Sequence, residues 1–312
     1  MIVYQFQQAS VEHPDRCEDA ILVSSNAGHA PVFAIIDGMG GHKHELADGR
    51  VLTGRDAALL IHDVLIEDLE HFEPTASADP DSETEQQLLA GISRAHAKLF
   101  SDLNGGEGLS LRERLGAVLT AVVVCEEGKR LLVAQVGDSR AYVYTDEELI
   151  QLCPDEDNIE HLVRRQVLSA RDAEKISAVL NTYDGVSEPT VEGTITLGGQ
   201  VYELYMAWRW FLVGNQALNI PASNVVINSM GTHEEDPIAE RSRIEIGAGD
   251  ILLLCSDGLY KNLSEAEIIN GLHSADADDP AKMLGEAALA RSQDKSNSRK
   301  NPDDISVIVV KF

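Results

Sequence analysis

The sequence has few cysteine, proline and aromatic residues. Its 312 residues include 4 cysteines and 10 prolines, and aromatic residues make up 5% of the chain. Cys17, Cys125, Cys153 and Cys255 are far apart and form no Cys-x-x-Cys pair, which favours reduced core thiols over a zinc or redox motif. No apolar run approaches the roughly 20 residues that span a bilayer, and the chain does not open on a basic segment followed by an apolar one. We therefore expect a cytoplasmic protein that is neither secreted nor inserted in a membrane.

Basic residues are also scarce. The chain has 25 Lys and Arg residues against 52 Asp and Glu residues, which gives a formal net charge of −27. Such a charge repels nucleic acid and anionic membranes, and it favours cations or basic protein surfaces as partners. With 44% hydrophobic residues, the chain can bury a large core without disulfides or oligomerisation. We expect a monomer with one large domain, no nucleic-acid partner and no membrane partner.

Apolar periodicity predicts a mixed fold. Short runs rich in Val, Ile and Leu predict buried strands at 21–24, 32–36, 118–125, 131–136, 251–255 and 305–310. Stripes at three-to-four spacing predict helices within 61–72 and 88–103. The capping-box spacing of Ser264 and Glu267, and the pair Asp279-Pro280, predict two more helices before the last strand. Because strands and helices come in groups rather than alternating, the pattern favours an α+β fold with sheets sandwiched between helix layers.

An irregular stretch at about 180–222 contains an aromatic run. Residues 201–211 carry two tyrosines, two tryptophans and a phenylalanine, and this run predicts an aromatic strand. Alternation along such a strand places Trp208 and Trp210 on one face. That face either packs in a core or docks a partner or substrate.

Carboxylates stand at the ends of five predicted strands. Asp37, Asp138 and Asp257 follow apolar runs, and the pairs Glu18-Asp19 and Asp303-Asp304 open two others. A single Asp-Gly pair is typical of a turn. Five acidic positions at one edge of buried strands, however, repel one another and need cations. Oxygen ligands without His or Cys at metal spacing indicate Mg²⁺ or Mn²⁺ rather than Zn²⁺.

The motifs around these carboxylates resemble those of a known family. They are, in order, Asp37-Gly38-Met39-Gly40-Gly41-His42, Gly137-Asp138-Ser139-Arg140, Ser256-Asp257-Gly258-Leu259 and Asp303-Asp304-Ile305-Ser306-Val307. Their order and spacing resemble the metal-dependent, type 2C protein phosphatases, in a divergent, bacterial-like branch, across nearly the whole chain. The resemblance implies a central β-sandwich of two antiparallel sheets flanked by α-helices, in four αββα layers. It also implies a single domain over 1–312, with an enlarged flap at about 153–230 beside the active site.

The same resemblance implies an activity and a ligand set. The protein is expected to be a phosphoserine/phosphothreonine protein phosphatase in which a water activated by two Mn²⁺ or Mg²⁺ ions attacks the phosphoryl group directly. By carry-over, Asp37 bridges the two ions, with Asp19 and the Gly38 carbonyl on one side and Asp257 and Asp303 on the other. Asp138 helps to hold a third, weaker ion, and Glu18 acts as a ligand or through water. A phosphorylated protein is the expected substrate.

Two departures from the family pattern concern the reaction. Pro14 stands where family members usually carry an arginine that grips the substrate phosphate, and Arg16 and His13 are the candidate substitutes. Met39 stands where many eukaryotic relatives have a histidine, so His42 either donates a proton to the leaving group or makes a structural hydrogen bond to a nearby carboxylate. Without the arginine, the alternative function is a catalytically weak or silent relative that binds a phosphoprotein or a regulatory partner.

The roles of two further residues, Asp304 and Arg140, are also interpreted from the motifs. Asp304 replaces the asparagine that is typical of the family, and its charge either strengthens cation binding or faces solvent. Arg140 is interpreted as an internal ion-pair partner that orients neighbouring acids rather than as a phosphate ligand.

Overall fold

The structure is a computed structural model of the whole chain. It describes residues 1–24, 30–46, 48–69, 80–110, 113–125, 129–155, 159, 162–163, 165–182, 189–213, 215, 218, 228–273, 278–294, 297 and 299–312. These residues form two compact units, one of Met1–Pro154 with Asn228–Phe312 and one of Asp155–Ile227.

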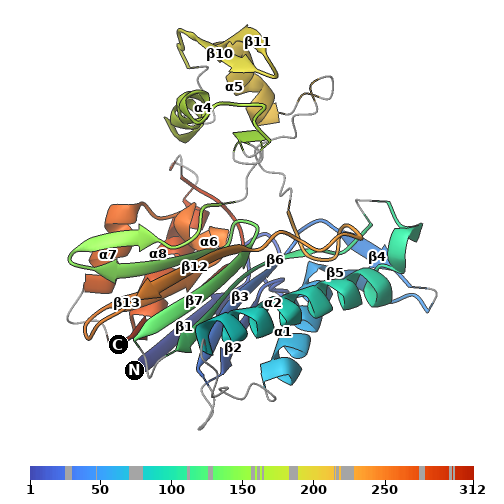
Figure 1. Cartoon of the computed structure of the whole chain (residues 1–312), viewed down its shortest axis with the longest axis vertical. Coiled ribbons are helices and arrows are strands. Elements are labelled where there is room, and N and C mark those ends of the chain that lie inside the picture. Colours follow the sequence, from blue (N-terminus) through green and yellow to red (C-terminus); the bar gives the residue numbers. More distant parts are fainter. Residues whose placement is uncertain are drawn as a thin grey trace. The chain divides into compact units, whose positions relative to one another are not determined.

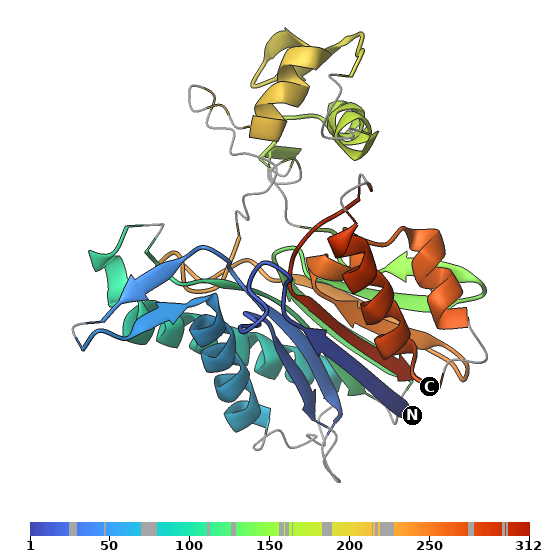
Figure 2. The ribbon, with the colours of Figure 1, turned by 180° about the vertical axis from the view of Figure 1, so that it is seen from behind.

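The first unit is built on two antiparallel five-stranded sheets (Figure 1). The strands of one sheet are, in spatial order, β1 (Ile2–Gln8), β14 (Ile305–Lys311), β13 (Ile251–Cys255), β8 (Arg140–Thr145) and β9 (Glu148–Gln151). Those of the other are β12 (Glu240–Glu245), β7 (Arg130–Val136), β6 (Ala117–Cys125), β3 (Val32–Gly38) and β2 (Ala20–Ser24). The chain termini lie on neighbouring strands, because Ile2 pairs with Lys311 (Figure 2).

The apolar runs are continuous because both faces of the central strands are buried. Along β3, Phe33 and Ile35 point into the core between the two sheets, whereas Ala34 and Ile36 point toward helices on the outer face. This two-residue alternation follows from strand geometry. All six strands that the Val-, Ile- and Leu-rich runs predict are present.

Helices cover the outer face of each sheet (Figures 1 and 2). On one side, α1 (Gly54–Leu69) packs on β2 and β3, and α2 (Pro80–Lys98) continues into a π-helical turn at Leu99–Leu103 and a 3₁₀ turn at Gly106–Gly108. The other side carries α6 (Asp257–Tyr260), α7 (Glu265–His273) and α8 (Pro280–Gln293). The predicted four-layer αββα sandwich is therefore confirmed.

The predicted helix starts near the C-terminus are also present. The Glu267 carboxylate accepts hydrogen bonds from the backbone N–H and the hydroxyl of Ser264, at 2.8 and 2.7 Å. Asp279 caps α8 by accepting from the N–H of Lys282 at 2.9 Å, and Pro280 is its first residue. These contacts satisfy N–H groups that the first helical turn leaves unpaired.

A small hairpin precedes α1 and was not predicted. Its strands are β4 (Lys43–Glu45) and β5 (Val51–Thr53), paired so that Lys43 lies opposite Thr53. The segment is too short and too polar to give an apolar strand signal.

The second unit has its own core, built from α4 (Ala170–Thr182), β10 (Thr194–Leu197), β11 (Gln200–Glu203) and α5 (Leu204–Val213). The predicted aromatic strand over 201–211 is wrong, since β11 ends at Glu203 and residues 204–213 are helical. Leu204, Ala207 and Phe211 are buried at helical spacing, and Trp208 is buried with them. A short apolar aromatic run does not separate a strand from a buried helix. The assignment of this unit as a flap remains a prediction.

No helix in the described ranges is both long and apolar enough to cross a bilayer. All four cysteines are free thiols.

Candidate metal centre and the adjoining pocket

The register of the two sheets brings the predicted carboxylates to one end of the sandwich. In one sheet, Ala20 pairs with Ile36, so Glu18-Asp19 before β2 meet the end of β3 at Asp37-Gly38. In the other sheet, Cys255 pairs with both Arg140 and Val307. Asp257 follows the end of β13, and Asp138 and Asp303 precede the starts of β8 and β14. All three therefore lie at the same edge of this sheet.

Asp37 is the centre of this carboxylate cluster. Burial raises the pKa of Asp37 well above its usual range, and the charges of Asp19, Asp257, Asp303 and Asp138, in that order, raise it further. All four carboxylates are therefore close enough to act on Asp37. The residue as a whole is only partly exposed to solvent.

The neighbouring acids are perturbed in the same direction. Burial raises the pKa of Asp19 well above its ordinary value, and burial together with the charge of Asp257 raises the pKa of Asp303 to about 7. Burial likewise raises the pKa of Glu18. The cluster thus holds more negative charge than the nearby protein groups neutralise. Such an excess is the electrostatic condition for a cation site.

The oxygen atoms fit cations as ligands. Both carboxylate oxygens of Asp19 and Oδ1 of Asp257 are buried without a well-formed hydrogen bond. Within the described ranges, no three acidic, His or Cys side chains already stand close enough to share one ion. The strand ends therefore gather the carboxylates within electrostatic reach of Asp37, without the spacing of a formed ion site.

Lys261 supplies one positive charge to this cluster. Its Nζ lies 2.5 Å from Oδ2 of Asp257 and 3.9 Å from Oδ2 of Asp138. Burial by itself would lower the pKa of Lys261, but the charges of Asp257 and Asp138 raise it overall, so the ammonium is retained. The sequence carried a signal for this contact, since a lysine four residues after an aspartate on a helix reaches back to it.

Gly38 is required at the end of β3 by close packing. A Cβ atom there would lie 2.3 Å from the Gly54 carbonyl oxygen and 2.5 Å from that of Glu18. No side chain fits in that space.

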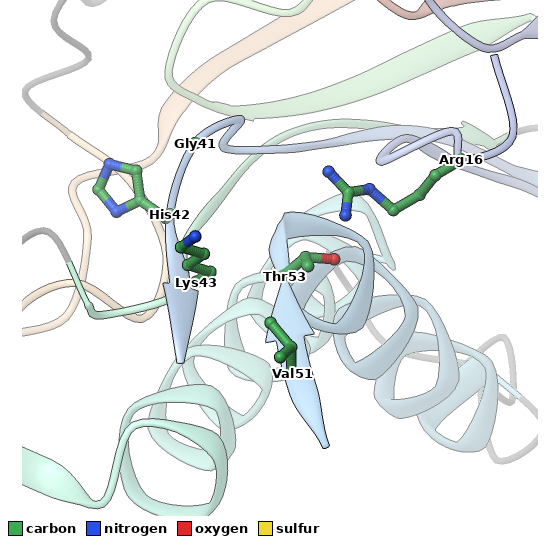
Figure 3. A pocket seen from close by; sticks show the side chains of 6 residues that line it. All are labelled: Arg16, Gly41, His42, Lys43, Val51 and Thr53. Carbon is green, nitrogen blue, oxygen red and sulfur yellow. The ribbon is translucent and has the colours of Figure 1, made fainter. Parts of the chain in front are cut away.

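Beside the cluster lies a pocket of about 410 Å³, lined by Arg16, Gly41, His42, Lys43, Val51 and Thr53 (Figure 3). Nη2 of Arg16 is 3.1 Å from Oε1 of Glu18, so this guanidinium stands between the pocket and the carboxylate cluster. His42 Nδ1 donates a hydrogen bond to the carbonyl oxygen of Arg114 at 2.8 Å. One expectation for His42 was a hydrogen bond to a nearby carboxylate; the structure instead pairs this nitrogen with a backbone carbonyl.

His13 does not line this pocket. Its Nδ1 lies 2.8 Å from the carbonyl oxygen of Arg16 and 3.7 Å from Oδ1 of Asp304. Of the two candidates for the missing arginine, only Arg16 lines the pocket, which leaves His13 the weaker candidate for phosphate binding.

Comparison with known proteins supplies the family. A family model described as protein phosphatase 2C matches residues 9–290. The chain belongs to the protein phosphatase 2C family. This confirms the resemblance drawn from the four motifs.

Curated relatives of this family member are named as phosphatases. The serine/threonine protein phosphatase PstP of Mycobacterium tuberculosis is 27% identical over 282 residues, which cover 90% of this chain and 40% of PstP. The chain thus spans less than half of that relative. The serine/threonine phosphatase stp of Listeria innocua is 23% identical over 296 residues, which cover 94% of this chain and 89% of stp.

Solved structures of phosphatases share the fold. Stp1 from Staphylococcus aureus superposes with a TM-score of 0.65 at 20% identity, covering 99% of this chain and 94% of Stp1. The catalytic domain of PstP, solved in complex with 2 manganese ions, gives 0.59 at 22% identity, covering 99% and 96%.

Asp304 has a structural role in this phosphatase 2C family member. It is buried, its Oδ1 accepts from the N–H of Ser10 at 2.7 Å, and its Oδ2 accepts from the N–H of Glu18 at 2.6 Å. The expectation that its charge faces solvent is therefore wrong. Asp304 instead fastens the segment that carries Glu18 and Asp19 to the start of β14.

Arg140 lies over an aromatic ring. Its Cζ is 3.5 Å from the ring centroid of Tyr260, and its Nη1 donates to the Tyr142 hydroxyl at 2.9 Å. The Tyr260 hydroxyl in turn donates to the backbone carbonyl of Asp138 at 3.0 Å. Arg140 thus supports, through Tyr260, the turn that carries Asp138.

Proposed function

We propose that this chain is an active, metal-dependent phosphatase for phosphoserine and phosphothreonine in proteins. The observation that carries the proposal is the set of five carboxylates on Asp19, Asp37, Asp138, Asp257 and Asp303, which act on one another at one end of the sandwich. The phosphatase names of the relatives, and the two manganese ions bound by PstP, support Mn²⁺ as the cofactor. Mg²⁺ is the alternative ion for an oxygen-only site.

The ligands are proposed as follows. Asp37 would be shared by two ions; Asp257 and Asp303 would help to hold one of them, and Asp19 with the Gly38 carbonyl would help to hold the other. Glu18 acts as a ligand or through water, since Arg16 already pairs with it. When bound, the two ions supply a water of lowered pKa as the nucleophile and neutralise the phosphoryl oxygens.

Phosphate capture is assigned to Arg16. A guanidinium presents five N–H donors in a planar fork, and pairing of one nitrogen with Glu18 leaves others for phosphoryl oxygens. Arg16 is half-exposed on the pocket side, so substrate can reach it. This placement substitutes for the arginine that Pro14 replaces.

Proton donation to the departing serine or threonine oxygen is assigned to His42. Its Nδ1 donates to the Arg114 carbonyl, so the proton on that nitrogen is fixed and Nε2 is the atom that exchanges a proton. The alternative is that this hydrogen bond makes His42 purely structural.

A third, weaker ion at Asp138 competes with Lys261. The ammonium already stands near both Asp138 and Asp257, so an additional cation has to displace it or bear its repulsion. We therefore propose two strongly held ions, with the third position weakened in this chain.

Pro14 favours one specific alternative, a weak or silent relative that binds a phosphoprotein. The first assay is release of phosphate from a phosphothreonine peptide with Mn²⁺ or Mg²⁺, by the wild type and by Asp257→Asn. An active phosphatase releases phosphate only with a divalent ion, and Asp257→Asn loses at least about 100-fold in kcat/KM because a ligand is gone. Saturable cation binding without any phosphate release supports the silent alternative. The cytoplasmic location, the monomeric state and the flap remain predictions from the sequence.

A further inference from the structure

The pocket beside the carboxylate cluster has an unusual charge. Three of its six lining residues, Arg16, His42 and Lys43, are basic, and none of the lining residues is acidic. The chain as a whole has twice as many acidic as basic residues, 52 against 25. A small cationic pocket within a surface of opposite sign concentrates anions locally.

The basic residues come from two segments; the Arg16 guanidinium points toward the hairpin, whereas the His42 ring lies on the side of β4 away from Arg16 (Figure 3). Arg16 precedes β2, whereas His42 and Lys43 lie at the start of the β4–β5 hairpin (Figure 3). Val51 and Thr53, on the partner strand, complete the wall beneath them. The hairpin thus forms one side of the pocket.

The pocket adjoins the proposed reaction centre through Glu18. Arg16 pairs with Glu18, and the Thr53 side chain hydrogen-bonds to the same carboxylate. Gly40, beside Gly41 in the wall, also lies against Glu18, since a Cβ there would be 3.5 Å from its Oε2. The pocket therefore lies next to Glu18 at the edge of the carboxylate cluster.

Lys43 is the basic group that the proposed chemistry does not use. Its side chain is exposed, and no acidic group of the described residues is paired with it. Arg16 and His42 already have roles toward the phosphoryl group and the leaving oxygen. The positive charge of Lys43 is therefore available to bind an anionic group of the substrate other than the reacting phosphate.

We propose that this pocket, which we call the Lys43 pocket and define by its six lining residues, binds a second anionic group of the substrate. The group is an acidic side chain or a second phosphate within a few residues of the phosphorylated serine or threonine. A volume of about 410 Å³ holds one such side chain with its water. The inference rests on the proposed phosphatase function and names its substrate class.

The experiment compares three phosphothreonine peptides that are identical except for one flanking position, which carries glutamine, glutamate or phosphoserine. Peptides with the flanking position on either side of the phosphothreonine are included. The quantity of interest is the ratio of kcat/KM for the charged peptide to that for the glutamine peptide. We expect a ratio of about three to ten for the wild type, falling to about one in Lys43→Gln and remaining in Lys43→Arg.

Lys129→Gln is the matched control. This lysine is exposed and precedes β7, at the end of the sandwich away from Asp37, and should leave the ratio unchanged. Lys43→Glu should invert the preference, so that a peptide with a flanking lysine becomes the better substrate. Preference for glutamate or for phosphoserine tells which anion the pocket accepts.

The two ideas fail in different ways. Hydrolysis of all peptides with a ratio of one, or a ratio that Lys43→Gln leaves intact, overturns the Lys43 pocket and keeps the phosphatase. If no peptide is hydrolysed, the phosphatase function fails, and the pocket is judged by fluorescence anisotropy of the same peptides. Equal Kd values for charged and neutral peptides then overturn it, and a charge-dependent Kd lost in Lys43→Gln supports it.

Discussion

Replacing Lys261 by methionine should increase the affinity of the candidate metal centre for a further divalent ion. Methionine keeps an unbranched side chain of similar length and removes the ammonium. In the wild type, Nζ is 2.5 Å from Asp257 and 3.9 Å from Asp138, so a cation that uses both carboxylates must replace these contacts. The change therefore removes a competitor without touching any proposed ligand.

The magnitude follows from the two contacts. At an effective dielectric constant of about 20, charges 3.9 Å apart interact by about 4 kcal/mol before desolvation. The Lys261 side chain is 42% exposed, so solvent screening reduces the net contribution of the pair to roughly 1 to 2 kcal/mol. That free energy corresponds to a factor of about 5 to 30 in Kd.

Mn²⁺ binding measured by calorimetry and by the signal of free Mn²⁺ in electron paramagnetic resonance tests this directly. The weakest ion should bind about 5 to 30 times more tightly to Lys261→Met than to the wild type. Lys282→Met is the matched control, because Lys282 forms an i,i+4 pair with Glu286 on α8 away from the cluster. An unchanged or weaker Mn²⁺ affinity in Lys261→Met, with normal folding, would show that Lys261 does not compete with the ion.

Three further results are expected. Burial and the charge of Asp257 raise the pKa of Asp303 to about 7, so the folded protein binds a proton more tightly at this residue than the unfolded chain does. In the presence of EDTA, the free energy of unfolding should therefore fall as pH rises from about 4 to about 7. Melting temperatures that stay constant or rise over this pH range would contradict this. Gly258→Ala should destabilise by roughly 2 to 3 kcal/mol in urea titrations, since its Cβ would lie 1.9 Å from the Asp304 carbonyl oxygen; a loss below about 0.5 kcal/mol would count against that packing. Glu267→Ala removes the α7 capping box and a contact with Arg291, and the same titration should show a loss of about 1 to 2 kcal/mol, whereas an unchanged midpoint excludes the role.

The parts of the fold that the sequence predicted are those with the simplest burial pattern. β3, β6 and β14 are apolar on both faces, so their runs stand out against the turns that bound them. β1 and β12 alternate exposed and half-buried residues, and their signal is weaker. The prediction of a strand over 201–211 was wrong because the apolar residues of this run fit the helical periodicity as well as the strand periodicity.

The candidate site was predicted as a set of residues but not as a network. The aspartates followed from their places at strand ends, because antiparallel register brings those ends together. The fastening role of Asp304 depends on two backbone N–H groups far away in sequence, which no local pattern reveals. The position of Lys43 depends on the short β4–β5 hairpin, which has no apolar periodicity from which it could be predicted.

We propose that cations held by Asp37 and its neighbours activate the water that hydrolyses phosphothreonine. The most direct measurement follows Mn²⁺ binding and phosphate release from a neutral phosphothreonine peptide on the same samples of wild type and Asp37→Asn. We expect two tightly bound ions and metal-dependent release for the wild type, and the loss of both in a folded Asp37→Asn protein. Phosphate release without a divalent ion, or full release by Asp37→Asn, would contradict it.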